Sequence, residues 1–149
     1  MKSLIAATVA LIGIFVSPEV HAQYSIDDLT KACGEGNMNR VISILDSGVN
    51  INAKDSKGWF PISKAAVNGQ DDVLYILISR RADVDITTRR QNTPMLFAAS
   101  RGHEEAVRLL LNAGANSFIA NVDREVPESI ARAKGYPRIA EMIYDFQRR

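Results

Sequence analysis

A spacing of thirty-three residues runs through most of this chain. Glycines recur at this spacing, and so do alanines, prolines and aliphatic residues. The members of these columns are Gly36, Gly69, Gly102 and Gly135; Ala32, Ala65, Ala98 and Ala131; Pro61, Pro94 and Pro127; Leu29, Ile62 and Met95; and Ile44, Leu77, Leu110 and Ile143. Such a period predicts stacked structural units, each of which buries an apolar face against the next. A stack displays its residues on one continuous surface, so the pattern favours binding as the function.

The unit from Asn92 to Asn116 shows the pattern most completely. Thr93 is a good N-cap, and Pro94 suits the first helical turn, where its missing N–H is not needed. Gly102 fits the left-handed residue that ends a first helix. A second, amphipathic helix then runs up to Gly114, which stops it. The sequence therefore predicts a unit of helix, tight turn, helix and exposed hairpin.

This unit resembles the repeat of the ankyrin family. The resemblance is carried by the opening Thr93-Pro94-Met95-Leu96, the pair Ala98-Ala99, the step Gly102-His103, the leucines at 109–111 and the close Gly114-Ala115-Asn116. It extends from Ser25 to the end of the chain. It implies an all-α solenoid of about four helix-turn-helix units with hairpin loops, at residues 25–54, 55–87, 88–120 and 121–149. It also implies a protein-binding module rather than an enzyme, with no cofactor and no metal.

Two of the departures from the pattern of the family lead to structural expectations. Phe60 stands where the other unit has its capping Thr93, so we expect a weaker start to that helix. Cys33 takes the place of an alanine in the alanine pair, so we expect it to pack between helices as a small hydrophobic residue rather than as a reactive thiol. It is the only cysteine, so the chain forms no internal disulfide.

Residues 1–22 have the composition of a secretory signal peptide. Lys2 supplies a positive charge, residues 4–16 are apolar, and Val20-His21-Ala22 places small residues at a cleavage site. A membrane anchor is the alternative, but a spanning helix needs about 20 apolar residues. We therefore expect cleavage after Ala22, no membrane insertion afterwards, and a mature chain of residues 23–149 that is periplasmic or secreted.

Catalytic chemistry finds little support in the sequence. His103 is the only histidine after residue 22, and it lies in the glycine-histidine step of a repeat. The adjacent acids Asp71-Asp72 and Glu104-Glu105 share one phase of the period, at expected helix starts, where the helix dipole favours them. The chain has 18 basic and 17 acidic residues, a balance that does not suggest a nucleic-acid partner.

Candidate binding residues follow from the resemblance, since the hairpin tips and the exposed side of the first helices usually meet the partner in such arrays. The positions selected in this way are Lys54, Lys57, Trp59, Val67, Asn68, Arg89, Arg90, Asn92, Arg101, Asp123 and Glu125. The basic members belong to the second and third units, apart from Lys54 at the end of the first, and the acidic ones belong to the fourth. We expect a polarised groove that binds an acidic protein surface through arginine. Charges that only solvate the hairpin tips are the alternative.

Trp59 is the most distinctive candidate. A solvent-facing hairpin residue has no need of an indole for folding, whereas interfaces favour tryptophan and arginine. The alternative is that Trp59 folds back onto Phe60 and the adjacent unit. Both interpretations stay open on the sequence alone.

Three functions are compatible with a small exported array that is monomeric when free. The first is an inhibitor or immunity protein that caps an envelope hydrolase such as a cell-wall peptidase, because a rigid concave face loses little entropy on binding. The second is an accessory factor for the maturation or cofactor supply of an oxidative-stress enzyme such as catalase. The third is a scaffold subunit of an envelope complex.

Overall fold

The computed structural model describes residues 23–149, which form eight helices joined by turns and loops, without a strand. The predicted signal peptide, residues 1–22, lies outside the described residues. None of the eight helices combines the length and the apolar character that crossing a bilayer requires. The helices are α2 (Ile26–Glu35), α3 (Met38–Asp46), α4 (Pro61–Val67), α5 (Asp71–Ser79), α6 (Pro94–Arg101), α7 (Glu104–Asn112), α8 (Pro127–Lys134) and α9 (Pro137–Gln147).

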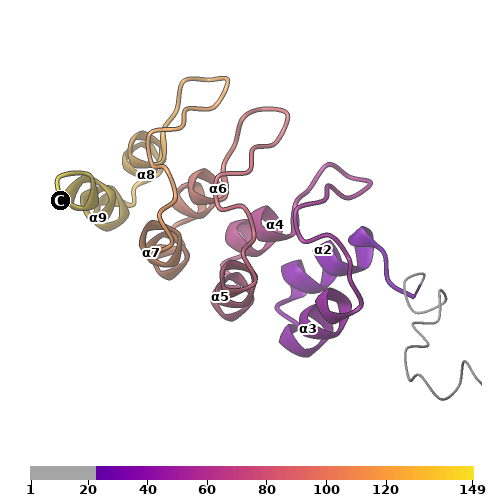
Figure 1. The fold of residues 1–149 in the computed structure, drawn as a ribbon. Coiled ribbons are helices and arrows are strands. Elements are labelled where there is room, and N and C mark those ends of the chain that lie inside the picture. Colours follow the sequence, from indigo (N-terminus) through magenta and orange to yellow (C-terminus); the bar gives the residue numbers. More distant parts are fainter. Residues whose placement is uncertain (1–22) are drawn as a thin grey trace, which may run out of the picture.

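The helices form two parallel rows (Figure 1). The first helices of the pairs, α2, α4, α6 and α8, pack on one another in an inner row, from which the long loops project. The second helices, α3, α5, α7 and α9, form the outer row. This arrangement confirms the predicted all-α solenoid of helix-turn-helix units.

The repeated residues lie where the rows need them. The alanine column is fully buried in the inner row, where the absence of a larger side chain lets neighbouring helices approach closely. The aliphatic column of the outer helices is also fully buried, and both columns belong to one continuous apolar core. The buried members are Ala32, Ala65, Ala98, Ala131, Ile44, Leu77, Leu110 and Ile143.

The helix ends follow the local sequence. The side chain of Thr93 caps α6 by accepting a hydrogen bond from the N–H of Leu96, at 3.1 Å. Phe60 precedes α4 and supplies no side-chain cap, in contrast to Thr93. Gly102 ends α6 in the left-handed conformation, with φ of 79°, as predicted.

The glycine column has a second role, which is contact between units. A Cβ at Gly69 would lie 2.5 Å from Nδ1 of His103, and one at Gly102 would lie 2.5 Å from Cε1 of Tyr136. The residue that follows each glycine turn thus lies directly against the glycine of the preceding unit. At Gly135, by contrast, nothing lies within 4 Å of the corresponding point.

Two alanine substitutions separate these roles. Gly102 and Gly135 both have positive φ, at 79° and 85°, so either substitution forces alanine into a conformation that costs about 1 kcal/mol. Only at Gly102 must a neighbouring ring also move, at a further cost of about 1–3 kcal/mol. Gly102→Ala should therefore lower the free energy of unfolding, measured in urea, clearly more than Gly135→Ala. Equal losses would contradict the role in contact.

Cys33 is fully buried between the helices, as predicted. Burial raises the pKa of its thiol to about 12, from an ordinary value of 9.0. The folded state therefore favours the neutral thiol. The resulting stabilisation is complete below pH 9 and is lost as the pH rises towards 12.

We predict that Cys33 is unreactive in the native protein. At pH 8 the thiol should react with a disulfide reagent at least about 100-fold more slowly than in denaturant, because the helices must first open to expose it. A Cys33→Ala variant should lose less stability than the unsubstituted protein between pH 9 and 12. In the reactivity measurement, rapid reaction of the folded protein with the disulfide reagent would contradict the burial of the Cys33 side chain.

Candidate functional site

Three loops project from the inner row as hairpins (Figure 1), between α3 and α4, α5 and α6, and α7 and α8. Each tip is closed by hydrogen bonds to the residue that begins its turn. The carboxylate of Asp55 accepts from the N–H groups of Lys57 and Trp59, at 2.9 and 2.7 Å. The amide oxygen of Asn121 accepts in the same way from Asp123 and Glu125. The middle hairpin has Thr88 at this phase, and its hydroxyl accepts a single bond of 3.3 Å from Asn92.

Neighbouring hairpins are joined by side chains that accept backbone hydrogen bonds from the next unit. Asn52 accepts from the N–H of Asp83 at 2.9 Å, and Asp85 accepts from the N–H of Asn116 at 2.8 Å. In the first unit the carboxylate of Asp27, on α2, accepts from the N–H of Ser56 at 2.7 Å. The projecting loops are thus fixed both internally and to one another.

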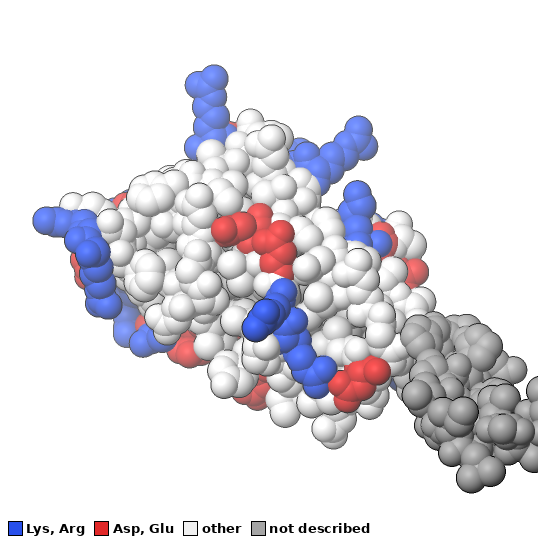
Figure 2. All heavy atoms as spheres, viewed as in Figure 1, with Lys and Arg blue, Asp and Glu red and all other residues white. Residues whose placement is uncertain are grey.

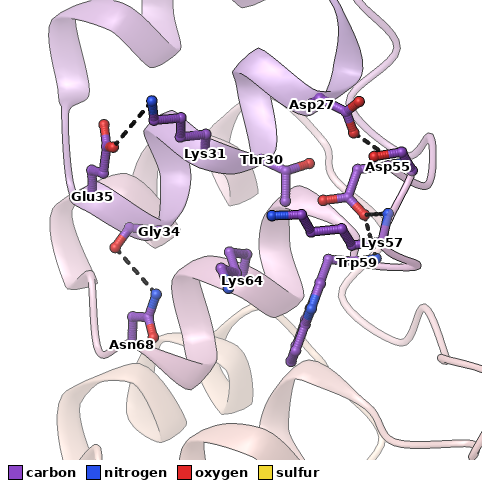
Figure 3. Close-up of a pocket in the computed structure, with 11 residues that line it drawn as sticks. Asp27, Thr30, Lys31, Gly34, Glu35, Asp55, Lys57, Trp59, Lys64 and Asn68 are labelled. Atoms are coloured by element: carbon purple, nitrogen blue, oxygen red, sulfur yellow. Dashed lines mark hydrogen bonds and ion pairs between the residues drawn. The ribbon is translucent and has the colours of Figure 1, made fainter.

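The hairpins and the inner helices enclose a groove with two open cavities, which we name the inner groove. The first cavity, of about 530 Å³, lies between α2, α4 and the first hairpin (Figure 3). The second, of about 450 Å³, lies between the first two hairpins and Phe97 of α6. The second cavity is lined by Lys54, Lys57, Gly58, Trp59, Thr88, Arg89, Arg90, Asn92 and Phe97.

Trp59 lines both cavities. Its half-buried ring lies against Phe97, with ring centroids 5.2 Å apart and planes inclined by 43°. The ammonium group of Lys64 lies 4.8 Å from the centre of the indole. Packing therefore fixes the ring against the adjacent unit, as the alternative interpretation expected for that unit, and leaves part of the indole accessible to the groove.

The structure brings most of the predicted binding residues together. Lys54, Lys57, Trp59, Arg89, Arg90 and Asn92 line the second cavity. Asn68 lines the first cavity, where its amide donates to the carbonyl of Gly34 at 3.1 Å. Figure 2 shows lysine and arginine side chains extending from the edge that carries the hairpins.

The remaining candidates lie elsewhere or already have partners. Arg101 is exposed at the end of α6 but lines neither cavity. Asp123 of the fourth unit pairs with Arg90 at 2.7 Å, so it neutralises part of the basic surface. Glu125 accepts a hydrogen bond from Asn121 at 2.9 Å. The prediction for Val67 is wrong, because this last residue of α4 turns its side chain into the interior.

The sequence prediction missed five residues of the first unit and Lys64 of the second. The lining of the first cavity also includes Asp27, Thr30, Lys31, Gly34, Glu35 and Lys64. One column of the period contained the signal, since Lys31, Lys64 and Phe97 share a phase on the inner helices and all line the groove. The sequence prediction followed the ends of these helices and not this column.

His103 and residues of the two acidic pairs interact with neighbouring residues of the fold. Nε2 of His103 lies 3.1 Å from the carbonyl of Val67, and because a carbonyl only accepts, this nitrogen donates. Burial, and then the nearby Glu105, raise the pKa of Asp71, although His103 opposes the rise. Glu104 pairs with Arg108 at 3.2 Å. Within residues 23–149 no three histidine, cysteine or acidic side chains are placed to hold a metal ion.

The sequence matches a family model described as "Ankyrin repeats (3 copies)", over residues 29–121 and 72–145. It is 31% identical over 116 residues to the Schizosaccharomyces pombe "Ankyrin repeat-containing protein P1E11.10", covering 77% of this chain and 55% of that protein. It is 32% identical over 111 residues to the "Putative E3 ubiquitin-protein ligase XBAT35" of Arabidopsis thaliana, covering 72% of this chain and 24% of the relative. It is likewise 32% identical over 100 residues to the "Ankyrin repeat and SOCS box protein 2" of Bos taurus, covering 66% of this chain and 16% of that protein. The chain thus spans about half of the first relative and a quarter or less of the other two.

Trp59→Ala should lower the stability of the fold as well as alter the groove. Loss of the contact with Phe97 should reduce the free energy of unfolding by about 1–2 kcal/mol, and Trp59→Phe should recover part of this. Urea unfolding followed by circular dichroism measures both changes. An unchanged midpoint for Trp59→Ala would mean that the ring contributes no packing.

Proposed function

Because the chain belongs to the ankyrin repeat family, we propose that its inner groove binds a protein partner outside the cytoplasm. Repeats of this kind are protein-binding modules, and the inner groove is a concave surface suited to that role. The observation that carries the proposal is Trp59, whose partly accessible ring joins two open cavities. Interfaces concentrate their binding energy on such aromatic residues.

Preorganisation supports tight binding by this small surface. The hairpin tips are closed by Asp55 and Asn121. Outside the tips, Asn52 and Asp85 join neighbouring hairpins to one another. A surface that is already ordered loses little conformational entropy when a partner binds. The inner groove can therefore bind without first folding its loops.

The location rests on residues 1–22, whose charged start, apolar run and small-residue cleavage site fit an export signal. We place the mature protein in the periplasm, or secreted from it. N-terminal sequencing of the protein recovered from the cell envelope tests this, with Gln23 as the expected first residue. An intact Met1 in all of the recovered protein would contradict export.

For the partner we propose an envelope hydrolase, such as a cell-wall peptidase, which the chain inhibits by covering the active-site mouth. The support is physical, since a rigid, projecting array can close a cleft at low entropic cost. The groove is basic at its second cavity, so the surface that it covers should be acidic.

Affinity capture from envelope extracts, with residues 23–149 as bait, tests the use of the groove. Arg89→Glu should weaken capture about tenfold or more, because it reverses a charge inside the second cavity. Lys134→Glu is the matched control, since Lys134 is exposed on α8 outside the groove. Equal capture by both variants would remove the inner groove from the proposal.

An activity assay of the captured protein then tests inhibition. A captured hydrolase should lose activity as the array is added, at one array per enzyme. A gain of peroxidase activity, or no effect on any captured enzyme, would contradict an inhibitor.

A further inference from the structure

The second cavity of the inner groove is strongly asymmetric in charge. Its lining contains four cationic side chains and no carboxylate. Within residues 23–149, only one of the four, Arg90, forms an ion pair, with Asp123. The other three, Lys54, Lys57 and Arg89, are exposed around the rim. An excess of uncompensated positive charge in a concave site attracts and orients carboxylates.

The wall of the same cavity is apolar. Trp59 and Phe97 are both half-buried and lie side by side, with centroids 5.2 Å apart. When an apolar side chain covers a partly accessible aromatic ring, the apolar area removed from water favours binding. The cavity thus offers cations at its rim and an aromatic surface beneath them.

The first cavity has a different balance of charge. Lysines line it as well, but so do the carboxylates Asp27, Glu35 and Asp55 (Figure 3). Glu35 pairs with Lys31 at 3.9 Å, while Asp27 and Asp55 accept backbone hydrogen bonds. An acidic ligand is therefore favoured in the second cavity over the first.

We infer that the second cavity recognises an extended acidic segment of the protein partner, in which two neighbouring carboxylates are followed by an apolar residue. The carboxylates face Lys54, Lys57 and Arg89, and the apolar side chain covers Trp59 and Phe97. A cavity of about 450 Å³ between two fixed hairpins accommodates a few side chains of a linear segment. This inference rests on the proposed function only in taking the ligand to be a protein.

The single tryptophan of the chain makes the cavity its own reporter. Synthetic peptides, blocked at both ends, would be titrated into residues 23–149 while Trp59 fluorescence is recorded. The peptide Gly-Glu-Glu-Leu-Gly should give a saturable change. Replacing both glutamates by glutamine should weaken binding about tenfold, through loss of charge-assisted hydrogen bonds. Replacing leucine by alanine should weaken it about fivefold, through loss of apolar contact.

Matched variants locate the binding. Lys57→Gln and Arg89→Gln should each lower the affinity for the acidic peptide several-fold, because each removes one exposed ion pair. Lys134→Gln on α8 should leave its affinity unchanged. Circular dichroism checks that each variant is folded. Equal affinities for the glutamate and glutamine peptides, equal affinities for the leucine and alanine peptides, or no saturable change would overturn the inference.

The failure of this inference differs from that of the proposed function. If no peptide binds, but Trp59→Phe and Arg89→Glu still weaken capture of the partner, the groove binds a folded surface and only the inference fails. If the acidic peptide binds but does not displace the captured partner, the specificity of the cavity stands. In that case the proposal that the inner groove binds the captured partner fails.

Discussion

The stack depends on one small contact that is repeated between units. The residue after each glycine turn lies against the glycine of the preceding unit, as His103 does on Gly69 and Tyr136 on Gly102. Nε2 of His103 also reaches the carbonyl of Val67, and the amide of Gln70 makes the equivalent bond to Gly34, each at 3.1 Å. Glycine meets two demands at once, a left-handed backbone and room for a neighbour. This contact fixes how each helix pair lies on the next.

The groove is a consequence of that fixed stacking. Because the units repeat at constant geometry, side chains distant in sequence, such as Lys57 and Arg89, line one cavity. The hairpins add hydrogen bonds of their own, with Asp55 and Asn121 closing the tips and Asp85 joining one hairpin to the next. Recognition thus uses side chains on a scaffold whose shape is already set.

The sequence predicted the fold well because periodicity is a property of the fold itself. The fully buried Ala65 and Leu77 could be placed from spacing alone, and Thr93 and Gly102 from their capping chemistry. The site was harder to predict, because a column of repeated residues shows where a residue lies within its unit but not which side chains it contacts. Spacing could not show that Trp59 packs on Phe97 or that Asp123 neutralises Arg90, because both are contacts between units. The prediction for Val67 was wrong for a related reason. Asn68, which follows it at the same helix end, is exposed, but spacing does not show that Val67 itself is buried.

The turn at Gly135 has the left-handed geometry of the earlier turns, with φ of 85°, yet the space where a following residue would lie is open. The architecture is modular, because each of the units in residues 23–149 contacts only its neighbours. A longer groove, with additional cavities along it, is accessible to this fold by simple duplication of a segment.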